Sequence, residues 1–359
     1  MQPREPSAPL TAAVVGAGSG GTLSIDALLA SPRFRLLGVA DVEPAARDRV
    51  RARAPHVRTF GSHEELLAAC PTDVVCVSTY APTHLPIAQA ALAANVRGLL
   101  VEKPLGDTTA NGAAVLDSAR AAGVPMVVPH GLMAQAAPLQ VIEQVRGGAI
   151  GPLRLVQMEC TGCDIINAGI HWIQFFLTLA GSPVESVLTA CDVSTRTYRD
   201  GMQVETEAIT QARCADGTRL LLNTGDDIPT AHPDTSCLMR IVGDHGMLEY
   251  AAWESRYTVI DDHRRQVVDV APFEVSGHRR HLEHLADLIA ADRLDETVPR
   301  SSVRALEVVE AAYLSNRERR AVSLPLSQPA SAPPAAELSP WDPGAPYSGV
   351  GGGRNGRTL

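Results

Sequence analysis

The chain has 359 residues, a formal net charge of −9 at pH 7, 45% hydrophobic residues and only 4% aromatic residues. This length has room for about two domains with sizeable cores. The acidic balance and the scarcity of aromatic side chains argue against a nucleic-acid binder and against binding to an anionic membrane. Without an apolar signal core or a membrane-length stretch, we expect a cytoplasmic protein.

After a polar N-terminus over residues 1–9, apolar runs alternate with alanine-rich helical segments. Strands that are buried on both faces of a parallel sheet form continuous apolar runs. Residues 10–129 therefore predict a doubly wound α/β domain of the Rossmann type. The expected strands are Ala12–Val15, Leu36–Ala40, Val74–Ser78, Gly98–Val101 and Gly123–Val128, and the expected helices are Leu23–Ala30, Pro44–Arg53, His63–Ala69, Pro86–Ala94 and Thr109–Ala122.

The turn after the first strand has the spacing G-x-G-x-x-G, with glycines at positions 16, 18 and 21. Gly16 permits a sharp turn, Gly18 lets the backbone approach a pyrophosphate, and Gly21 lets the helix pack near the strand. Ser19 and Gly20 lie at the helix N-terminus, whose N–H groups and dipole favour phosphate. We predict a dinucleotide site here; the alternative is a plain strand-to-helix turn.

Asp41 ends the second apolar run, twenty residues beyond Gly21. At this distance an acid holds the ribose hydroxyls of NAD and repels the 2′-phosphate of NADP. The expected cofactor is therefore NAD, although Arg47 is close enough in sequence to leave NADP open. The alternative for Asp41 is a surface aspartate.

Two further strand ends carry polar residues at the edge where doubly wound sheets bind ligands. Ser78, Thr79 and His84 follow the strand from Val74 and are expected to contact the cofactor, although Thr83 could simply cap the next helix. Glu102-Lys103-Pro104 follows the strand from Gly98, and Glu102 and Lys103 are also expected to contact the cofactor. The Lys103 ammonium can bind a substrate hydroxyl and stabilise a developing alkoxide; the alternative is a Glu–Lys surface pair.

The second half of the chain, residues 130–320, predicts an α+β domain on an open, mostly antiparallel sheet. The expected strands are Leu153–Thr161, Val187–Asp192, Glu205–Cys214, Thr218–Thr224, Ser236–Val242, Met247–Tyr250 and Tyr257–Asp261, and the expected helices are Pro138–Gly147, Ile170–Ala180, His278–Ala291 and Val303–Glu318.

Residues 321–359 are rich in proline, glycine, alanine and serine, a composition typical of disorder. They also contain Trp341 and Arg354. We hypothesise an extended arm that lies on the body of the protein or on a neighbouring subunit.

These motifs, in this order, resemble the glucose-fructose oxidoreductase/inositol dehydrogenase (Gfo/Idh/MocA) family over residues 10–320. The segment Ile241–Glu249 is similar to a glycine-containing hairpin of the family's substrate domain. The resemblance implies NAD or NADP, hydride transfer at a sugar or cyclitol carbon, and a homo-oligomer formed through the C-terminal sheet.

The segment from Gly162 to Trp172 resembles the family's glycine-rich segment ending in D-x-G-x-H. The resemblance makes His171 the acid/base residue and places Asn167 where the family has a supporting aspartate. A neutral Asn can orient the ring but cannot stabilise an imidazolium by charge. Either His171 is then a weaker base, or Lys103 carries more of the proton transfer. Asp164 is the nearest acid in sequence, and Gln174 stands where a second acid often follows.

Other histidines and the cysteines are less informative. His130 follows the fifth strand and is a candidate substrate contact, and His232 is a weaker one. His278 and His281 flank two arginines, which indicates a solvated basic face. The seven cysteines are expected to be reduced core residues, and Cys160-Thr-Gly-Cys163 has no second pair at zinc spacing, so no metal site is predicted.

The sequence therefore predicts an NAD(P)-dependent oxidoreductase that acts on a secondary hydroxyl of a sugar, cyclitol or glycoside. Lys103, His171 and Asn167 are the expected catalytic residues, and they contact the substrate together with His130. Two alternatives stay open. One is a redox-neutral enzyme that cleaves glycosides through transient oxidation by bound NAD, and the other is a non-catalytic dinucleotide sensor.

Overall fold

The computed structural model describes residues 8–195, 197–199, 202–226, 228–230 and 235–327. The predicted N-terminal segment up to residue 7, His232 and the predicted arm from residue 328 lie outside these residues. The chain divides into two compact units. The first comprises Met1–Gly106, Ala113–Pro129 and Val275–Arg300, and the second comprises Asp107–Gly112, His130–Glu274 and Ser301–Leu359. Each unit is described by itself.

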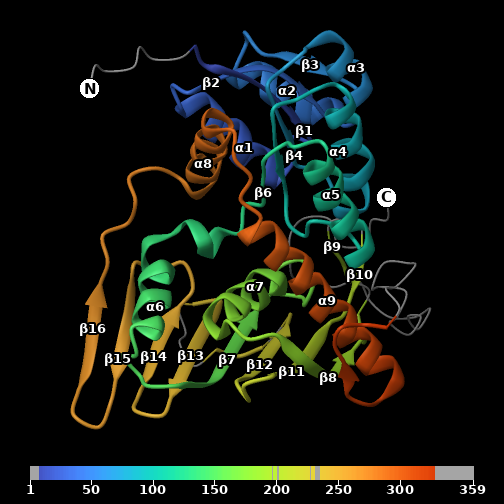
Figure 1. Ribbon diagram of the computed structural model, residues 1–359. Coiled ribbons are helices and arrows are strands. Elements are labelled where there is room, and N and C mark those ends of the chain that lie inside the picture. The colour runs from blue at the N-terminus through green and yellow to red at the C-terminus, as the bar shows by residue number, and fades with distance from the viewer. Residues whose placement is uncertain (1–7, 196, 200–201, 227, 231–234, 328–359) are drawn as a thin grey trace. The chain divides into compact units, whose positions relative to one another are not determined.

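The first unit is built on a six-stranded parallel sheet with the strand order β3-β2-β1-β4-β5-β6 (Figure 1). This is the order of a Rossmann fold, so the predicted architecture is confirmed. β3 was not expected because it has only three residues. The strands are β1 (Leu10–Val15), β2 (Phe34–Ala40), β3 (Arg58–Phe60), β4 (Val74–Val77), β5 (Gly98–Val101) and β6 (Met126–Val127).

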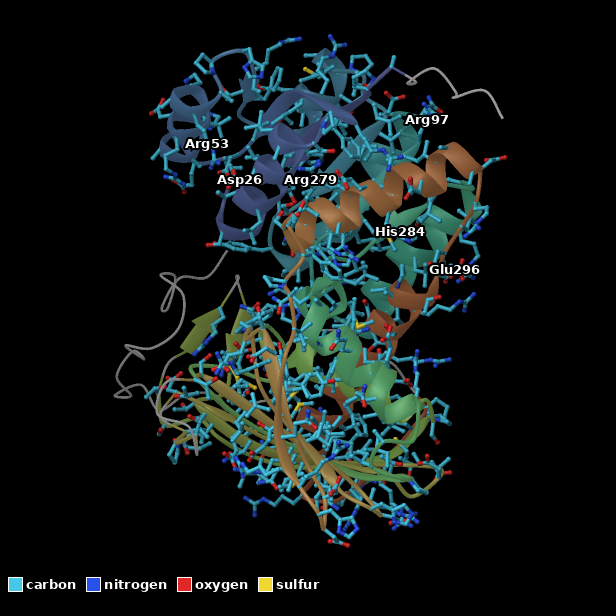
Figure 2. All side chains as sticks on the ribbon, turned by 90° about the vertical axis from the view of Figure 1, so that its left-hand side faces the viewer. Asp26, Arg53, Arg97, Arg279, His284 and Glu296 are labelled. Carbon is cyan, nitrogen blue, oxygen red and sulfur yellow. A yellow bond between two sulfur atoms is a disulfide. The ribbon has the colours of Figure 1, made fainter. Side chains whose placement is uncertain are left out.

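Helices connect these strands, and an ion pair between Asp26 and Arg53 joins α1 to α2 at 2.6 Å (Figure 2). α1 begins four residues earlier than predicted, directly at the glycine-rich turn. The helices are α1 (Ser19–Ala30), α2 (Pro44–Arg53), α3 (His63–Ala69), α4 (His84–Ala93) and α5 (Thr109–Ala121), with a 3₁₀ turn η1 (Ala81–Thr83) before α4.

The helix α8 (Gly277–Ala291) packs into the core of this first unit, although the sequence placed it in the second domain. Its apolar face, with Leu282 and Leu285, joins the core cluster that also contains Val14 and Leu100. Gly98 at the start of β5 makes room for it, because a Cβ there would lie 2.7 Å from Ile289. The contact is tertiary, so nothing local in the sequence signals it.

The second unit contains a nine-stranded sheet with the order β16-β15-β14-β13-β7-β12-β11-β8-β17. β7 and β12 are parallel and the other pairs are antiparallel, which confirms a mostly antiparallel sheet. Its strands are β7 (Leu153–Thr161), β8 (Val184–Asp192), β11 (Glu207–Cys214), β12 (Arg219–Gly225), β13 (Cys237–Gly243), β14 (Met247–Ala251), β15 (Arg256–Ile260), β16 (Arg265–Asp269) and β17 (Val322–Ser323).

The strand predicted from Glu205 differs from the structure. β11 begins at Glu207, and Glu205 lies between it and β10 (Met202–Val204), which pairs with β9 (Thr197–Arg199). Glu205 is 1% exposed. Glu205 is not part of a strand, and its carboxylate bonds the N–H of Ile165 and the hydroxyl of Tyr313.

The helices of this unit cover one face of its sheet (Figure 1). They are α6 (Ala136–Arg146), α7 (Gly169–Ala180) and α9 (Thr297–Glu318), and a 3₁₀ turn η2 (Gly131–Ala134) precedes α6. Alternate residues of β8 and β11 are buried against this side. On the opposite side Leu188 is 47% exposed and Ile209 is 55% exposed. No helix in the described part of the chain is both long and apolar enough to cross a membrane.

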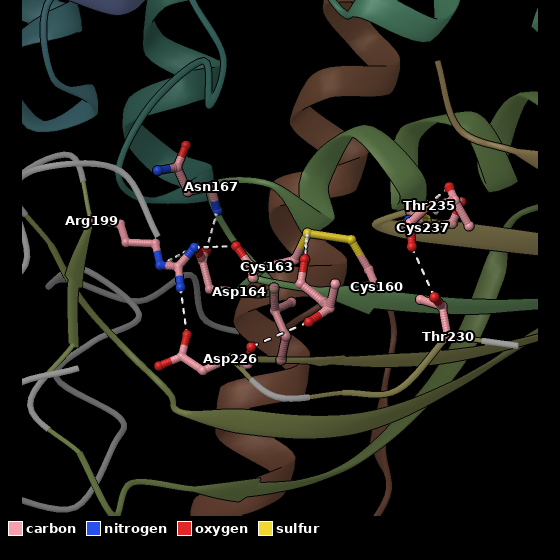
Figure 3. Close-up of a disulfide and its surroundings, with 12 residues drawn as sticks. Cys160, Cys163, Asp164, Asn167, Arg199, Asp226, Thr230, Thr235 and Cys237 are labelled. Atoms are coloured by element: carbon pink, nitrogen blue, oxygen red, sulfur yellow. Dashed lines mark hydrogen bonds and ion pairs between the residues drawn. A yellow bond between two sulfur atoms is a disulfide. The ribbon is translucent and has the colours of Figure 1, made fainter. Parts of the chain in front are cut away.

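The expectation that all cysteines are reduced is wrong for one pair. Cys160 and Cys163 form a disulfide, with their Cα atoms 5.9 Å apart (Figure 3). This separation lies within the range that a disulfide can span. The glycine between them, Gly162, has φ +68° and turns the chain back after β7. The described free cysteines are Cys70, Cys76, Cys191, Cys214 and Cys237.

Candidate functional site

The glycine-rich turn of the first unit is shaped by two close backbone approaches. Gly16 has φ +94°, and a Cβ there would lie 2.4 Å from the carbonyl oxygen of Ser78. A Cβ on Gly21 would lie 1.9 Å from the carbonyl oxygen of Gly16. Only glycine fits at both positions. Gly18 is the N-cap of α1 and has no side chain that could bond its first N–H groups.

Asp41 closes this turn from the end of β2. Its carboxylate accepts the backbone N–H of Ala17 at 2.6 Å and that of Glu43 at 2.8 Å. Arg47 donates to the carbonyl oxygens of Asp41 and Val42, at 2.6 and 3.0 Å. The acid therefore lies beside the glycine turn, as the sequence predicted, and the arginine that left NADP open lies next to it.

The loop after β4 lies against the same turn. The backbone N–H of Ser78 donates to Val15 at 2.7 Å, and the Thr79 hydroxyl accepts from Thr83. His84 is fully buried, and its Nε2 lies 3.1 Å from the carbonyl oxygen of Thr79. Burial lowers the pKa of His84. Its side chain therefore supports the loop from within, where the sequence predicted a contact with the cofactor.

Glu102 and Lys103 follow β5 at this edge of the sheet, and the Lys103–Pro104 peptide is cis. The Glu102 carboxyl is buried and packs against the turn, where a Cβ on Gly20 would lie 3.2 Å from it. Its Oε1 lies 2.7 Å from Nε2 of His278. Burial acts to raise the pKa of Glu102, but the hydrogen bond and charge of His278 outweigh it, so the pKa is lowered.

His278 is a residue whose role the sequence did not reveal. It was expected on a solvated basic face, yet its side chain is only 15% exposed and pairs with Glu102. The N-cap Ser276 accepts the N–H of Arg279 and fixes the start of α8, which positions His278. The two partners lie 176 positions apart in sequence, so no local signal connects them.

In the second unit, the candidate acid/base His171 lies in the first turn of α7. The preceding loop is tight: the N–H of Gly169 donates to the carbonyl oxygen of Asp164 at 2.7 Å, where a Cβ on Gly169 would also clash. The backbone N–H of Asn167 donates to Asp164 Oδ1 at 2.5 Å. Asp164 thus holds the backbone that carries Asn167 and His171. Gln174, one turn further, is buried and donates to Ser301 at 3.0 Å.

A buried charge network holds Asp164 in turn (Figure 3). Arg199 lies 3.4 Å from Asp164 Oδ2, donates to Asp226 Oδ1 at 2.7 Å and donates to the carbonyl oxygen of Gly162 at 2.5 Å. The side chains of Arg199, Asp164 and Asp226 are at most 6% exposed. The arginine thereby joins β9, the loop before α7 and the segment after β12.

Glu205 is the second acid of this region. Its carboxylate accepts the N–H of Ile165 at 2.7 Å and the hydroxyl of Tyr313 at 2.5 Å. Burial, followed by the nearby charge of Asp164, raises the pKa of Glu205 to about 7. Sequence reasoning missed Glu205, Arg199 and Asp226, because they are distant from His171 along the chain.

Three aromatic side chains surround the His171 ring. His130 meets it edge-on at 5.3 Å between ring centroids, Trp253 does so at 6.2 Å, and Trp172 is tilted at 6.4 Å. His130 is fully buried and bonds the Ser302 hydroxyl through Nε2 at 2.9 Å. The structure therefore brings the predicted substrate contact His130 to His171, and adds Trp253, which the sequence did not single out.

A family model described as "Oxidoreductase family, NAD-binding Rossmann fold" (GFO/IDH/MocA) matches residues 10–130. The chain carries the NAD-binding domain of this oxidoreductase family. The resemblance predicted from the glycine turn and Glu102-Lys103-Pro104 is thus confirmed. No curated protein matches the chain in sequence.

Solved structures of Gfo/Idh/MocA-type oxidoreductases share the fold across both units. An oxidoreductase from Agrobacterium radiobacter, in complex with NAD+, L-tartaric acid and magnesium, is 19% identical with a TM-score of 0.73, over 88% of this chain and 98% of that one. Aldose-aldose oxidoreductase from Caulobacter crescentus is 20% identical with a TM-score of 0.76, over 88% and 100%. The WlbA dehydrogenase from Bordetella pertussis, in complex with NADH and UDP-GlcNAcA, is 21% identical with a TM-score of 0.73, over 89% and 100%.

The residues of this Gfo/Idh/MocA domain fit the dinucleotide. Gly16 and Gly21 leave no Cβ at the turn, and Gly18 leaves the N-terminus of α1 open to phosphate. The carboxylate of Asp41, beside Ala17, is placed to accept ribose hydroxyls. Among the described residues, no group of three or more His, Cys, Asp or Glu side chains could hold a metal ion.

Proposed function

We propose that the protein is an NAD-dependent oxidoreductase that moves a hydride between the nicotinamide and a secondary hydroxyl carbon of a sugar, cyclitol or glycoside. The observation that carries the proposal is Lys103. It is the only lysine in a chain that otherwise uses arginine for every basic position. An ammonium is a compact point charge with three hydrogen-bond donors, whereas a guanidinium is a larger planar group. The single lysine follows Glu102, whose carboxyl packs against the cofactor turn.

Bound NAD would supply the hydride acceptor or donor. In our proposal the Lys103 ammonium donates a hydrogen bond to the reacting hydroxyl oxygen and stabilises its developing charge. His171 takes or returns the hydroxyl proton. Asn167, whose backbone is bonded to Asp164, orients the ring of His171 or the substrate. Asp41 favours NAD over NADP because its carboxylate repels a 2′-phosphate.

The proposed substrate class follows from the secondary hydroxyls of the compounds bound in similar structures. The similar structures include proteins crystallised with L-tartaric acid, with UDP-GlcNAcA and, for an aldose-aldose oxidoreductase, with glycerol. All of these compounds carry secondary hydroxyls. A sugar or cyclitol is therefore the first class to test, and glycosides extend it to the redox-neutral alternative.

The test is absorbance at the reduced-nicotinamide wavelength, with NAD or NADP and a panel of sugars, inositols and glycosides. We expect NADH formation with at least one member, and a loss of kcat of about 10²–10⁴-fold in Lys103→Met and in His171→Asn. Lys103→Arg keeps the charge but replaces the compact ammonium with a larger planar group, so it should also be impaired if the reacting oxygen needs the ammonium geometry. Glycoside cleavage without net NADH would instead favour the redox-neutral enzyme.

A second readout needs no substrate. An amine-directed acylating reagent has only Lys103 and the chain's amino terminus as targets. We expect NAD to slow the acylation of Lys103, measured by peptide mass spectrometry, while leaving the amino terminus unaffected. Tight NAD binding that leaves Lys103 reactivity unchanged, without turnover of any member of the panel, would contradict the proposal and favour a dinucleotide sensor.

We also propose that the open face of the second unit's sheet forms a homo-oligomer. Leu188 of β8 and Ile209 of β11 are exposed on that face, on neighbouring antiparallel strands. Exposed apolar side chains that gather on one sheet face favour association. We expect Ile209→Asp to lower the mass measured by light scattering, whereas Leu294→Asp, at an exposed apolar residue of the first unit, should not. An unchanged mass for both would contradict this interface.

A further inference from the structure

Trp253 has an unusual backbone for a tryptophan. It lies in the turn between β14 and β15 and has φ +72°, a conformation that bulky side chains rarely adopt. The surrounding structure holds it there. Its N–H donates to the Tyr250 hydroxyl at 3.1 Å, and the N–H of the preceding Ala252 donates to the carbonyl oxygen of Cys237 at 2.8 Å. Strained backbone of this kind is concentrated at functional sites.

The indole of Trp253 lies directly over the segment that carries His130 and over the start of α7. A Cβ on Gly131 would lie 2.8 Å from Cζ3 of Trp253, so the indole packs on the bare glycine backbone. The same indole meets the ring of His171 at 89°. It also meets the Trp172 ring, at 5.6 Å between centroids. Three contacts therefore fix the orientation of the Trp253 ring.

Trp253 as a residue is nevertheless only partly covered. Trp253 is 46% exposed, whereas its neighbour Trp172 is 2% exposed. Core packing explains Trp172 but gives no reason for an indole that is held in strain and left half exposed. An aromatic face attracts the weakly positive C–H groups of a ligand. The ring carbons of a pyranose or cyclitol with equatorial hydroxyls present such C–H groups together on one face.

We propose that Trp253 is a stacking platform that selects cyclic polyols at the His171 site. The proposal rests on the function proposed above and deepens it: the preferred substrate has a six-membered ring with a C–H face, and acyclic polyols are weaker substrates. The indole binds the ring, and the adjacent His171 then meets a hydroxyl on the ring edge. Trp253 thus determines specificity by contact with the substrate.

The test compares Trp253→Gly and Trp253→Phe in the full-length protein loaded with NAD. Glycine accepts φ +72° without strain, so Trp253→Gly removes the indole without forcing the turn to refold. Phenylalanine keeps an aromatic face. Val267→Ala, an exposed residue on β16 that is 53% exposed, is the matched control. The probes are myo-inositol and methyl β-D-glucopyranoside as rings, D-glucitol as an acyclic polyol, and uridine as a planar ring.

In Trp253→Gly we expect KM for the ring probe that is turned over to rise about 3–10-fold, since this matches the worth of an aromatic contact. The kcat and the KM for NAD should change less than about twofold. Trp253→Phe should restore most of the loss, and D-glucitol should be affected least. An equal rise for ring and acyclic polyols, or an unchanged KM in Trp253→Gly, would overturn the proposal while leaving the oxidoreductase function intact.

A binding readout separates the two proposals if no probe is turned over. The chain has three tryptophans, so the fluorescence change on adding a ring probe should be reduced in Trp253→Phe relative to wild type. Such a change without turnover would support the platform while counting against the proposed reaction. No fluorescence change with either ring probe, or a change with uridine alone, would overturn the platform.

Discussion

The turn at Gly16–Gly21 and the loop before His171 carry the two candidate sites, but one is built from backbone and the other from buried charged side chains. The turn is made of backbone, and its shape depends on the absence of Cβ atoms at Gly16 and Gly21. The loop before His171 depends on buried charges, with Arg199 between Asp164 and Asp226. The glycine spacing marks the first within one strand–turn–helix segment, although Ser78 from the end of β4 packs against it. The second needs partners from three separate segments.

The two regions should therefore be sensitive to different substitutions. A site made of backbone fails when one atom is added at the wrong place, because no side chain can move aside. A site made of buried charge fails when a partner is removed, because a charge is then left without compensation. The first failure should appear in cofactor affinity, and the second in stability and in its dependence on pH.

The largest expected effect is in the charge network. Arg199→Met should lower the free energy of unfolding by about 3–5 kcal/mol, because Asp164 and Asp226 lose a buried partner. Urea denaturation followed by circular dichroism measures it. Arg154→Met is the control: its pair with Asp244 is exposed and should cost less than about 1 kcal/mol. Equal losses of stability in Arg199→Met and Arg154→Met would contradict a special role for the buried network.

The glycine turn gives the next largest effect, on binding. Gly21→Ala places a Cβ against the carbonyl oxygen of Gly16, so we expect NAD affinity to fall about 100-fold, equivalent to about 2.7 kcal/mol. Calorimetric titration with NAD measures it. Gly123→Asn is the matched control, because φ there is +67° with open space around it, and asparagine tolerates this conformation. NAD affinity within threefold of wild type in Gly21→Ala would show that the turn can open.

The pH dependence of stability tests the role of Glu205 beside the loop before His171. The folded protein holds a proton on Glu205 up to about pH 7, whereas an unfolded glutamate releases it near 4.5. Raising the pH through this window therefore destabilises the fold, by about 1–3 kcal/mol. Glu205→Gln lacks this loss, so wild type should lose stability relative to the variant between pH 4.5 and 7. Denaturation curves that stay parallel over this window would contradict the assignment.

The smallest effect is expected for the Glu102–His278 pair, which lies beside the glycine-rich turn. Glu102→Gln should cost about 1–2 kcal/mol at pH 7, because the hydrogen bond to His278 loses its charge. The lowered pKa of Glu102 gives the opposite sign to Glu205: its stabilisation is present above about pH 4.5 and is lost as the pH falls. His278→Gln should lower the free energy of unfolding at pH 7 by a similar amount. Wild type and Glu102→Gln should then converge in acid, and a constant gap would exclude the pair as the cause.

The sequence predicted the Rossmann unit well because its signals are local. The apolar runs of β1, β2, β4 and β5, the glycines at 16 and 21, and Asp41 act within a few residues of one another or at a fixed spacing along one strand–helix–strand unit. The helices α2 and α3 match their predicted bounds, since Pro44 and Ser62 mark their starts. His171 was singled out through its glycine context and through family resemblance, and its role stays a prediction.

Several contacts of the candidate sites could not be predicted from the sequence and became visible only in the folded structure. The packing of α8 on β5, the pairing of His278 with Glu102, the network around Arg199 and the indole over His171 all join residues far apart in sequence. Hydrophobic periodicity identifies which side chains are buried, but not which buried side chains meet. Charges and aromatic rings act over a few ångströms in space, so their partners are fixed by the assembled fold, whereas a glycine turn is fixed by the chain itself.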